Sequence, residues 1–290
     1  NLPEDMQGAV LPENLPIEDK WILSLYNDLI KNVTSNLDSY ELGVAVQNLF
    51  DFIWDVYCDW YIELTKPRIA EGGETARAAQ NVLVYVMQGI LKLLHPFMPF
   101  ITEEIWQSMP IVADNNPESI MISAWPVYDE KLHFAAEQTD FTKVVDAIRA
   151  IRVQRNELNV PPSKKVTMYI ETAETALFEG AKAFFERLAG AGELTVSEKA
   201  ETSDDMVTIV TANARVFMPM GELVDKEKEL ARLEKERKAA QKDIDFLSGK
   251  LSNQGFLSKA PAQQIENERV KLAKAQEKME KIMLSIEKMK

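Results

Sequence analysis

The sequence predicts a mainly α-helical protein in three parts: an antiparallel helical bundle (residues 1–138), a small α+β linking subdomain (139–221) and a C-terminal antiparallel coiled-coil hairpin (222–290). Three patterns lead to this prediction. Apolar residues recur every three or four positions in the first part, as on the buried face of a helix. Short segments of alternating apolar residues, typical of strands, follow in the second part. Heptad repeats fill the third part.

Composition limits the class of protein. Of the 290 residues 46% are hydrophobic. No apolar run is long enough to span a membrane, and the N-terminus lacks the basic and apolar regions of a signal peptide. The one cysteine, Cys58, excludes an intrachain disulfide, and we expect it to be a buried, inert thiol. These features favour a cytoplasmic protein that does not insert into membranes.

The net charge of −13 is distributed unevenly. Residues 222–290 contain 16 basic and 13 acidic side chains, so the acidic excess lies in the rest of the chain. An acidic protein is not a general binder of nucleic acid, and we expect no binding to DNA. Any contact with nucleic acid must therefore come from local basic patches.

The bundle is predicted to contain four helices. We expect them from Ile17 to about Asn36, from about Glu41 to Leu64, from about Thr75 to Leu94, and from Pro99 onward. Pro67 should stop the second helix, and residues 67–74 should form a loop.

The second helix shows an apolar face and an acidic face. The apolar stripe consists of Val46, Leu49, Phe50, Ile53, Tyr57, Trp60, Tyr61 and Leu64. The opposite face presents Asp51, Asp55, Asp59 and Glu63. Such carboxylates could form a metal or acid–base site, but we interpret them as an ordinary solvated helix face.

The segment LKLLHPFMPFITEEIW (91–106) predicts a helix–corner–helix. Pro96 cannot continue a helix, whereas Pro99 suits the first turn of a new one. The corner should pack against the bundle, because Phe97, Met98 and Phe100 are apolar, and Ile101, Ile105 and Trp106 should point inward.

Residues 110–138 are predicted to be a linker with at most one short strand. A helix is expected over 140–156, a strand over 166–171, a short helix ending at Gly190, and further strands over 193–198 and 206–220. The last part shows two heptad seams interrupted by Gly255 and Pro261, which predicts a hairpin arm of roughly 45 Å.

Signals of catalysis are nearly absent. His95 and His133 are far apart in the sequence, and neither has the spacing of a metal ligand or of a base beside a nucleophile. No glycine-rich phosphate loop accompanies Gly72 and Gly73. We therefore assign no catalytic residue, no metal site and no cofactor to this chain.

Two basic groups are candidate RNA contacts. Arg149, Arg152 and Arg155 recur every three residues on one helix and precede Lys164 and Lys165. They form either a cationic face for a phosphate backbone or an ordinary solvated face. Lys250, Phe256 and Lys259 surround the predicted hairpin tip. Phe256 either stacks on a base or closes the end of the hairpin.

Together these segments resemble one family. LHPFMPFITEEIW, DKWILSLYNDLI, FDFIWDVYCDWYIELTK and AIRAIRVQRNELNVPPSKKV are similar to the anticodon-binding bundle of the class I aminoacyl-tRNA synthetases for valine, isoleucine and leucine. LEKERKAAQKDIDFLSGKLSNQGFLSKAP resembles the C-terminal arm of bacterial valyl-tRNA synthetases. The resemblance covers essentially the whole chain.

The resemblance implies a role in holding tRNA(Val). The bundle would read anticodon bases, and the arm would reach the outer corner of the tRNA near its D and T loops. The full enzyme would use ATP and Mg to attach valine, but this chain contains no His-x-Gly-His motif, no KMSKS-type loop and no editing domain. We therefore interpret it as an inactive C-terminal fragment, monomeric, with the first bundle helix missing.

One alternative belongs to another class of protein. Two heptad helices also suit a structural scaffold that self-associates through its coiled coil. Lys226, Arg237 and Glu268 at seam positions disfavour a simple dimer zipper without excluding it.

Overall fold

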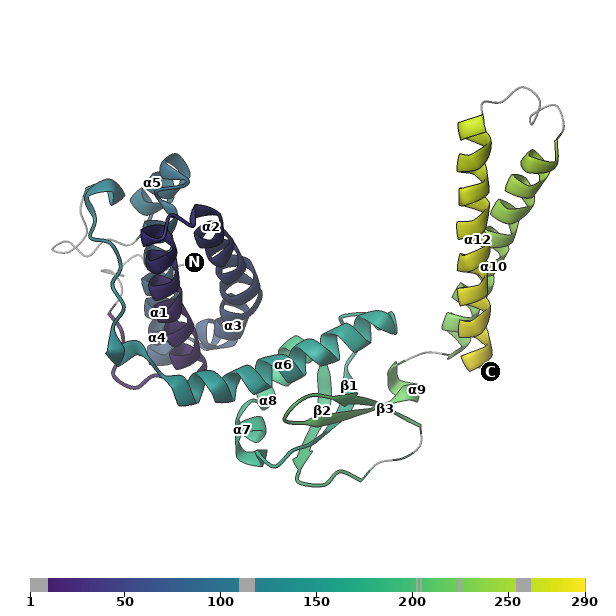
Figure 1. The fold of residues 1–290 in the computed structure, drawn as a ribbon. Coiled ribbons are helices and arrows are strands. Elements are labelled where there is room, and N and C mark those ends of the chain that lie inside the picture. The colour runs from purple at the N-terminus through teal and green to yellow at the C-terminus, as the bar shows by residue number, and fades with distance from the viewer. Residues whose placement is uncertain are drawn as a thin grey trace.

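The computed structural model describes residues 10–109, 118–201, 203, 205–223, 226–253 and 262–289, without the side chains of 226–233, 262–263 and 284–289. The fold is mainly helical with one small sheet, as predicted. Figure 1 shows the bundle, the sheet beneath a long connecting helix, and the hairpin beyond the sheet.

The bundle runs up, down and up again (Figure 1). The first helix, α1, spans Ile17–Asp38. The descending segment comprises α2 (Leu42–Asp51), a π-helical stretch (Phe52–Tyr61) and α3 (Ile62–Glu71). The ascending helix α4 spans Gly73–Leu94, and α5 (Pro99–Gln107) follows the corner. The ends of α1 and α4 and the starts of α2 and α5 therefore meet at one end of the bundle.

The descending segment differs from the prediction at Pro67. The helix continues through Pro67 to Glu71 and breaks only at Gly72, whose φ is 78°. A tertiary contact one residue past the proline accounts for the continuation. Arg68 donates to both carboxylate oxygens of Asp19, at 2.7 and 3.0 Å, and to Glu18 at 3.1 Å. The Tyr61 hydroxyl also donates to Asp19, at 2.7 Å. This buried ion pair holds the last turn against α1 and outweighs the cost of proline in a helix.

The π-helical stretch shifts the buried face of the descending segment. A π-helix places residues five apart on one side, and the buried positions include Leu49, Phe52, Tyr57 and Trp60. Val46 and Phe50, which we expected in the core, are exposed, while Phe52, which we had not singled out, is buried. Asp51, Asp55 and Asp59 are exposed, in agreement with the solvated-face interpretation.

The proline corner forms as predicted, but only part of it packs against the bundle. Pro99 begins α5, and the Thr102 hydroxyl donates to the carbonyl of Met98 at 2.9 Å. Only Trp106 among the three residues expected to point inward is buried. Met98, Phe100, Ile101 and Ile105 are exposed. Phe97, by contrast, is half-buried and packs against the core, so the bundle covers the corner only in part.

The linker packs back on α1 and contains no strand among its described residues, 118–138. Short 3₁₀ turns occupy Ile120–Ile122 and Glu130–Leu132. The Asn27 amide donates to the carbonyl of Asp129 at 2.8 Å and accepts from its N–H at 2.9 Å. Trp125 donates to Thr34 at 2.9 Å.

Helix α6 (Ala135–Glu157) connects the bundle to the sheet. Near its start Trp21 of α1 donates to Thr142 at 3.2 Å, and the Trp21 and Phe141 rings lie edge to face at 5.5 Å. Its later turns bury Ile148 and Ile151 in the same apolar cluster as strand residues. One buried core therefore extends across residue 138, where we placed the boundary between the first two parts. That boundary stays a prediction.

The sheet has four strands in the order β2-β1-β4-β3. They span Val166–Glu171 (β1), Ala191–Ser197 (β2), Met206–Val210 (β3) and Arg215–Pro219 (β4). β1 pairs parallel with β2, and β4 lies antiparallel to both β1 and β3. The crossover from β1 to β2 contains α7 (Thr175–Gly180), α8 (Lys182–Phe184) and a short π-helix (Phe185–Ala189). α9 (Met220–Leu223) follows β4.

The last part forms two paired helices, α10 (Lys226–Ser252) and α12 (Ala262–Met289), as Figure 1 shows. Each is about 40 Å long at 1.5 Å per residue. Ala240, Glu268 and Ile282 of the predicted seams are buried, whereas Arg237 is exposed. Most other seam positions with described side chains are half-buried, so the two helices cover much of the heptad pattern between them.

Candidate nucleic-acid interface

Arg149 and Arg152 lie on the exposed side of α6, where that helix passes the bundle. Each guanidinium carbon is 5.6 Å from the centroid of the Trp60 ring, a distance typical of a cation–π contact. Arg149 also pairs with Asp146 at 2.9 Å. No carboxylate of the described residues lies within ion-pair distance of Arg152, so its charge remains available.

Arg155, the third member of the series, is buried, with 6% of its surface exposed. Its Nη2 donates to the carbonyls of Pro161 at 3.2 Å and Lys164 at 2.7 Å, which fixes the turn after α6. Its Nη1 is buried without a hydrogen-bond partner among the described residues. Burial lowers the pKa of the guanidinium, because the charged form loses solvation. Arg155 therefore does not belong to an exposed cationic face.

Lys164 and Lys165 also differ from the expected arrangement. The Lys164 ammonium lies 3.5 Å from the carbonyl of Leu223, and that of Lys165 donates to the carbonyl of Glu186. Both contacts tie the turn after α6 to neighbouring elements. The five predicted residues are thus divided between an exposed pair, a buried arginine and two lysines engaged with the backbone.

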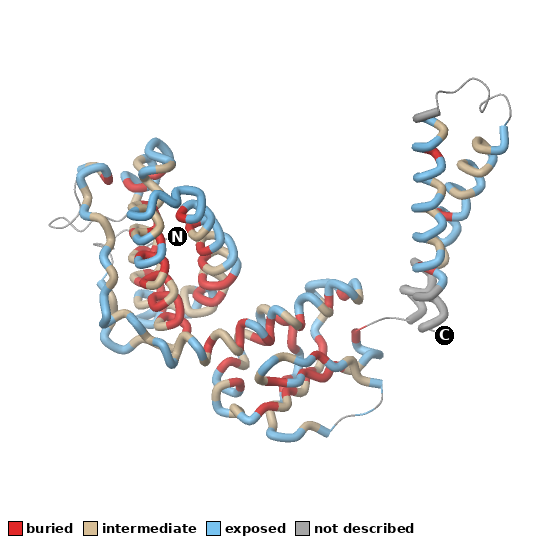
Figure 2. Tube along the Cα trace, viewed as in Figure 1, coloured by how far each residue is buried: buried red, intermediate tan, exposed pale blue. Residues whose placement is uncertain are grey.

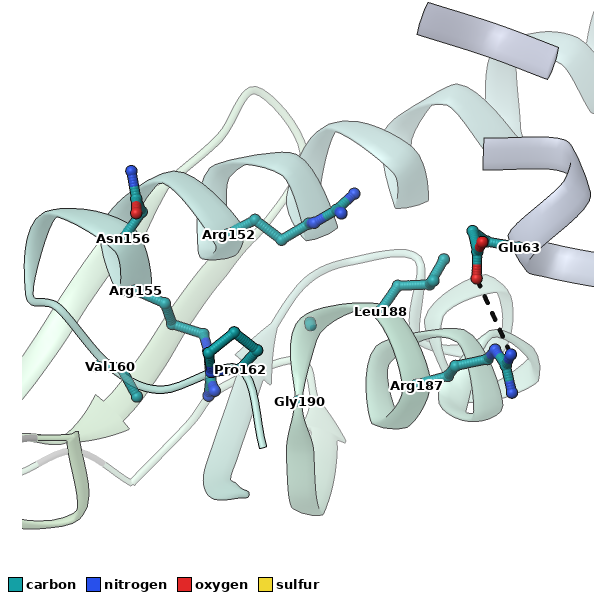
Figure 3. A pocket seen from close by; sticks show the side chains of 10 residues that line it. Glu63, Arg152, Arg155, Asn156, Val160, Pro162, Arg187, Leu188 and Gly190 are labelled. Atoms are coloured by element: carbon teal, nitrogen blue, oxygen red, sulfur yellow. Dashed lines mark ion pairs between the residues drawn. The ribbon is translucent and has the colours of Figure 1, made fainter. Parts of the chain in front are cut away.

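A cavity of about 420 Å³ lies beside this turn (Figure 3). We call it the arginine cavity; its polar and backbone lining includes Glu63, Arg152, Arg155, Asn156, Arg187 and Gly190. Arg187 belongs to the short π-helix before β2, and its Nη2 is 3.9 Å from the carboxylate of Glu63. Three arginines and one glutamate thus line the same cavity.

Gly190 shapes one wall of the arginine cavity. Its φ of 73° is left-handed, which favours glycine, and a Cβ there would lie 3.0 Å from the Arg155 guanidinium. The sequence indicated Gly190 only as a helix end. We also missed Arg187, because it is distant from α6 in sequence and the crossover connection alone brings it close.

Exposed apolar side chains gather at the end of the bundle where α1, α2, α4 and α5 meet. Figure 2 shows that many residues of α2 and α5 are exposed there. We call this surface the bundle tip, and it includes Tyr40, Leu42, Val44, Met98 and Phe100. Tyr40 is 90% exposed and Phe100 91%. Tyr40 also has a positive φ of 60°, which is strained for a residue with a side chain.

The predicted hairpin tip is only partly described. Lys250 lies 3.3 Å from Glu268 on the partner helix, so it forms part of the hairpin's own pairing. Phe256 and Lys259 lie outside the described residues. Phe246, which we did not single out, is 70% exposed on α10.

Both histidines and the single cysteine lie outside these surfaces. His95 Nδ1 lies 2.7 Å from the Thr102 hydroxyl, and His133 lies 4.0 Å from Asp28. Cys58 is half-buried rather than fully buried, and burial and the neighbouring Asp59 raise its pKa, which favours the unreactive thiol. Within the described residues, no three His, Cys, Asp or Glu side chains gather as a metal site would require. None of the described helices combines the length and apolarity of a membrane span.

Comparison with known proteins identifies both helical parts. Residues 19–170 match the family described as the anticodon-binding domain of tRNA ligase. Residues 225–290 match the family described as the valyl tRNA synthetase tRNA-binding arm. The first match spans the bundle, the linker, α6 and β1, and the second covers the hairpin.

Curated relatives agree with these matches. The chain is 42% identical over 274 residues to a valine–tRNA ligase of Clostridium acetobutylicum, which covers 93% of this chain and 31% of the relative. It is 39% identical over 284 residues to one of Staphylococcus carnosus, covering 97% of this chain and 32% of the relative. The chain thus spans about a third of the length of these relatives. It belongs to the family of anticodon-binding domains of tRNA ligases, and its hairpin belongs with the tRNA-binding arms of valyl-tRNA synthetases.

Proposed function

We propose that this chain is the tRNA-holding part of a valine–tRNA ligase. It recognises the anticodon and the outer corner of tRNA(Val), while another part of the enzyme attaches valine with ATP and Mg. The observation that supports this most strongly is the pairing, in one chain, of an anticodon-binding bundle with a valyl-type arm. The chain itself needs no cofactor, acts as a monomer and functions in the cytoplasm.

The bundle tip supports the proposal. Unstacked RNA bases are commonly recognised by stacking on exposed aromatic side chains. Tyr40 and Phe100 are almost fully exposed, and a left-handed backbone at Tyr40 costs stability that glycine would avoid. Because the strain at Tyr40 is not offset by burial of its side chain, we interpret the ring as a binding group.

The charge distribution also agrees with a selective contact. In a chain with a net charge of −13, Arg152 is an exposed positive charge on α6, and Arg149 lies exposed one turn before it. The scaffold alternative loses support because α10 and α12 already cover each other's seams, at Ala240 and Ile282.

A titration with RNA tests the proposal. The chain should bind tRNA(Val) more tightly than a tRNA with another anticodon, and both affinities should fall steeply between low and high salt. Tyr40→Gly should weaken binding of tRNA(Val) by about tenfold, since base stacking contributes about 1–3 kcal/mol. The same variant should keep or gain folding stability, which separates loss of contact from loss of fold. Equal affinity for both tRNAs, or no binding at low salt with tight self-association, would contradict the proposal.

A further inference from the structure

The arginine cavity concentrates positive charge in an acidic protein. Arg152, Arg155 and Arg187 line it, against the single carboxylate of Glu63 (Figure 3). Several guanidinium groups that line one cavity can bind an oxyanion, because their planar donors match its oxygens.

Arg155 lacks the partner that a buried charge needs. It is 6% exposed, and no carboxylate of the described residues pairs with it. Its two hydrogen bonds go to neutral carbonyls, and Nη1 has none within the described part of the chain. A buried cation without a counter-ion is unfavourable, and an anion in the cavity would offset that cost.

The two other arginines are able to reorient. Arg152 is exposed, and its guanidinium rests against the Trp60 ring at 5.6 Å, a contact that does not fix its donors. Arg187 is held by Glu63 at 3.9 Å, which is too long for a hydrogen bond. Glu63 also accepts from Lys66 on its own helix, so it is not committed to Arg187. An entering anion can therefore displace this weak pairing.

We propose that the arginine cavity binds a single phosphate group. The buried guanidinium of Arg155 contributes a positive charge in a fixed position. Arg152 and Arg187 donate hydrogen bonds to the phosphate oxygens. No aromatic side chain is among the described residues lining the cavity, so a phosphate suits it and a stacked base does not. The phosphate is either free in solution or part of an RNA backbone, and the second source rests on the function proposed above.

A titration of the full chain with inorganic phosphate at constant ionic strength tests the proposal. The side-chain Nε–H signals of ¹⁵N-labelled arginine report the site by NMR. We expect saturable shifts, about tenfold weaker binding in Arg152→Gln, and tighter binding, by up to about fivefold, in Glu63→Gln, which removes the competing carboxylate. Arg215→Gln on β4 is the matched control, because it removes one cation elsewhere, and its affinity should equal that of the wild type. Arg155 is left intact, since its loss would release the turn it fixes.

Tighter phosphate binding in Glu63→Gln distinguishes a specific phosphate site from general screening of positive charge. Absence of saturable shifts, or equal effects of Arg152→Gln and Arg215→Gln, would overturn the proposal whether or not tRNA binds. Where phosphate binds, a second titration with tRNA identifies the source. A log–log salt slope that is smaller by about one in Arg152→Gln assigns the site to an RNA backbone phosphate. An unchanged slope, or no tRNA binding at all, assigns it to free phosphate and leaves the cavity proposal standing.

Discussion

At the scale of single residues, the bundle depends on contacts that leave no space for a side chain at Gly89. A Cβ at this position of α4 would lie 1.7 Å from the hydroxyl of Tyr26, which is buried. Gly89→Ala should therefore lower the free energy of unfolding by about 1–3 kcal/mol, as overpacking does.

Gly43 provides the matched control for this prediction. It lies at an exposed helix position with no positive φ, and a Cβ there would have no neighbouring atom within 4 Å. Gly43→Ala should therefore be neutral or stabilising by about 0.4–1 kcal/mol. Urea unfolding followed by tryptophan fluorescence measures both variants. Equal effects of the two substitutions would show that the Tyr26 contact is unimportant.

Glu18 should make stability depend on pH in an unusual direction. Burial, helped by the charge of Asp19, raises the pKa of its carboxyl above the ordinary value of 4.5 despite the nearby Arg68. A pKa raised by folding contributes stability at acid pH, and that contribution is lost as pH rises through the folded value.

Glu18→Gln removes the cost of the buried charge. The variant should therefore unfold at higher urea than the wild type at about pH 8, and the difference should shrink as the pH falls towards about 5. Urea unfolding across this pH range measures the effect. A variant that unfolds at lower urea than the wild type at about pH 8 would show that the Arg68 pairing, rather than burial, dominates at Glu18.

At the scale of elements, periodicity located the helices but not every boundary or face. The start of α1 and the proline that begins α5 agree with the prediction. The continuation through Pro67 was not predictable, because it depends on Asp19, which lies far away in sequence. The exposed Phe50 was misassigned for a related reason: the π-helical stretch changes the spacing on which the periodicity argument relies.

The hairpin also contains a polar group that its heptad pattern does not explain. Glu268 is buried at the seam and pairs with Lys250 of α10 at 3.3 Å and with Lys271 at 3.1 Å. Polar residues at such positions fix register and partner choice at a cost in stability. Glu268→Leu should therefore raise the melting temperature of the arm, measured by helical circular dichroism, and promote self-association.

Glu266→Leu, on the exposed side of α12, is the control and should leave the melting temperature unchanged. Light scattering after size exclusion measures the association state of both variants. A lower melting temperature in Glu268→Leu would show that the buried ion pair stabilises the hairpin instead of only specifying its register.

At the scale of the whole molecule, the sequence identified basic side chains but not how the fold arranges them. Arginines spaced by three on α6 predicted a cationic face, but Arg155 is buried because it donates to carbonyls of the turn that follows the helix. The arginine cavity could not be predicted, because Arg187 and Glu63 reach it from other elements through tertiary packing. The sequence did not predict the bundle tip, because large apolar residues on a helix normally indicate a buried core.

The central claim is that this chain binds a folded tRNA at two separate places, the anticodon loop and the outer corner. Hydroxyl-radical footprinting of tRNA(Val) bound to the full chain at low salt tests it most directly. We predict protection of the anticodon loop by the bundle and of the outer corner, at the D and T loops, by the arm, with the acceptor end left open. Protection of the acceptor end alone, or no protection where binding is saturated, would contradict the account.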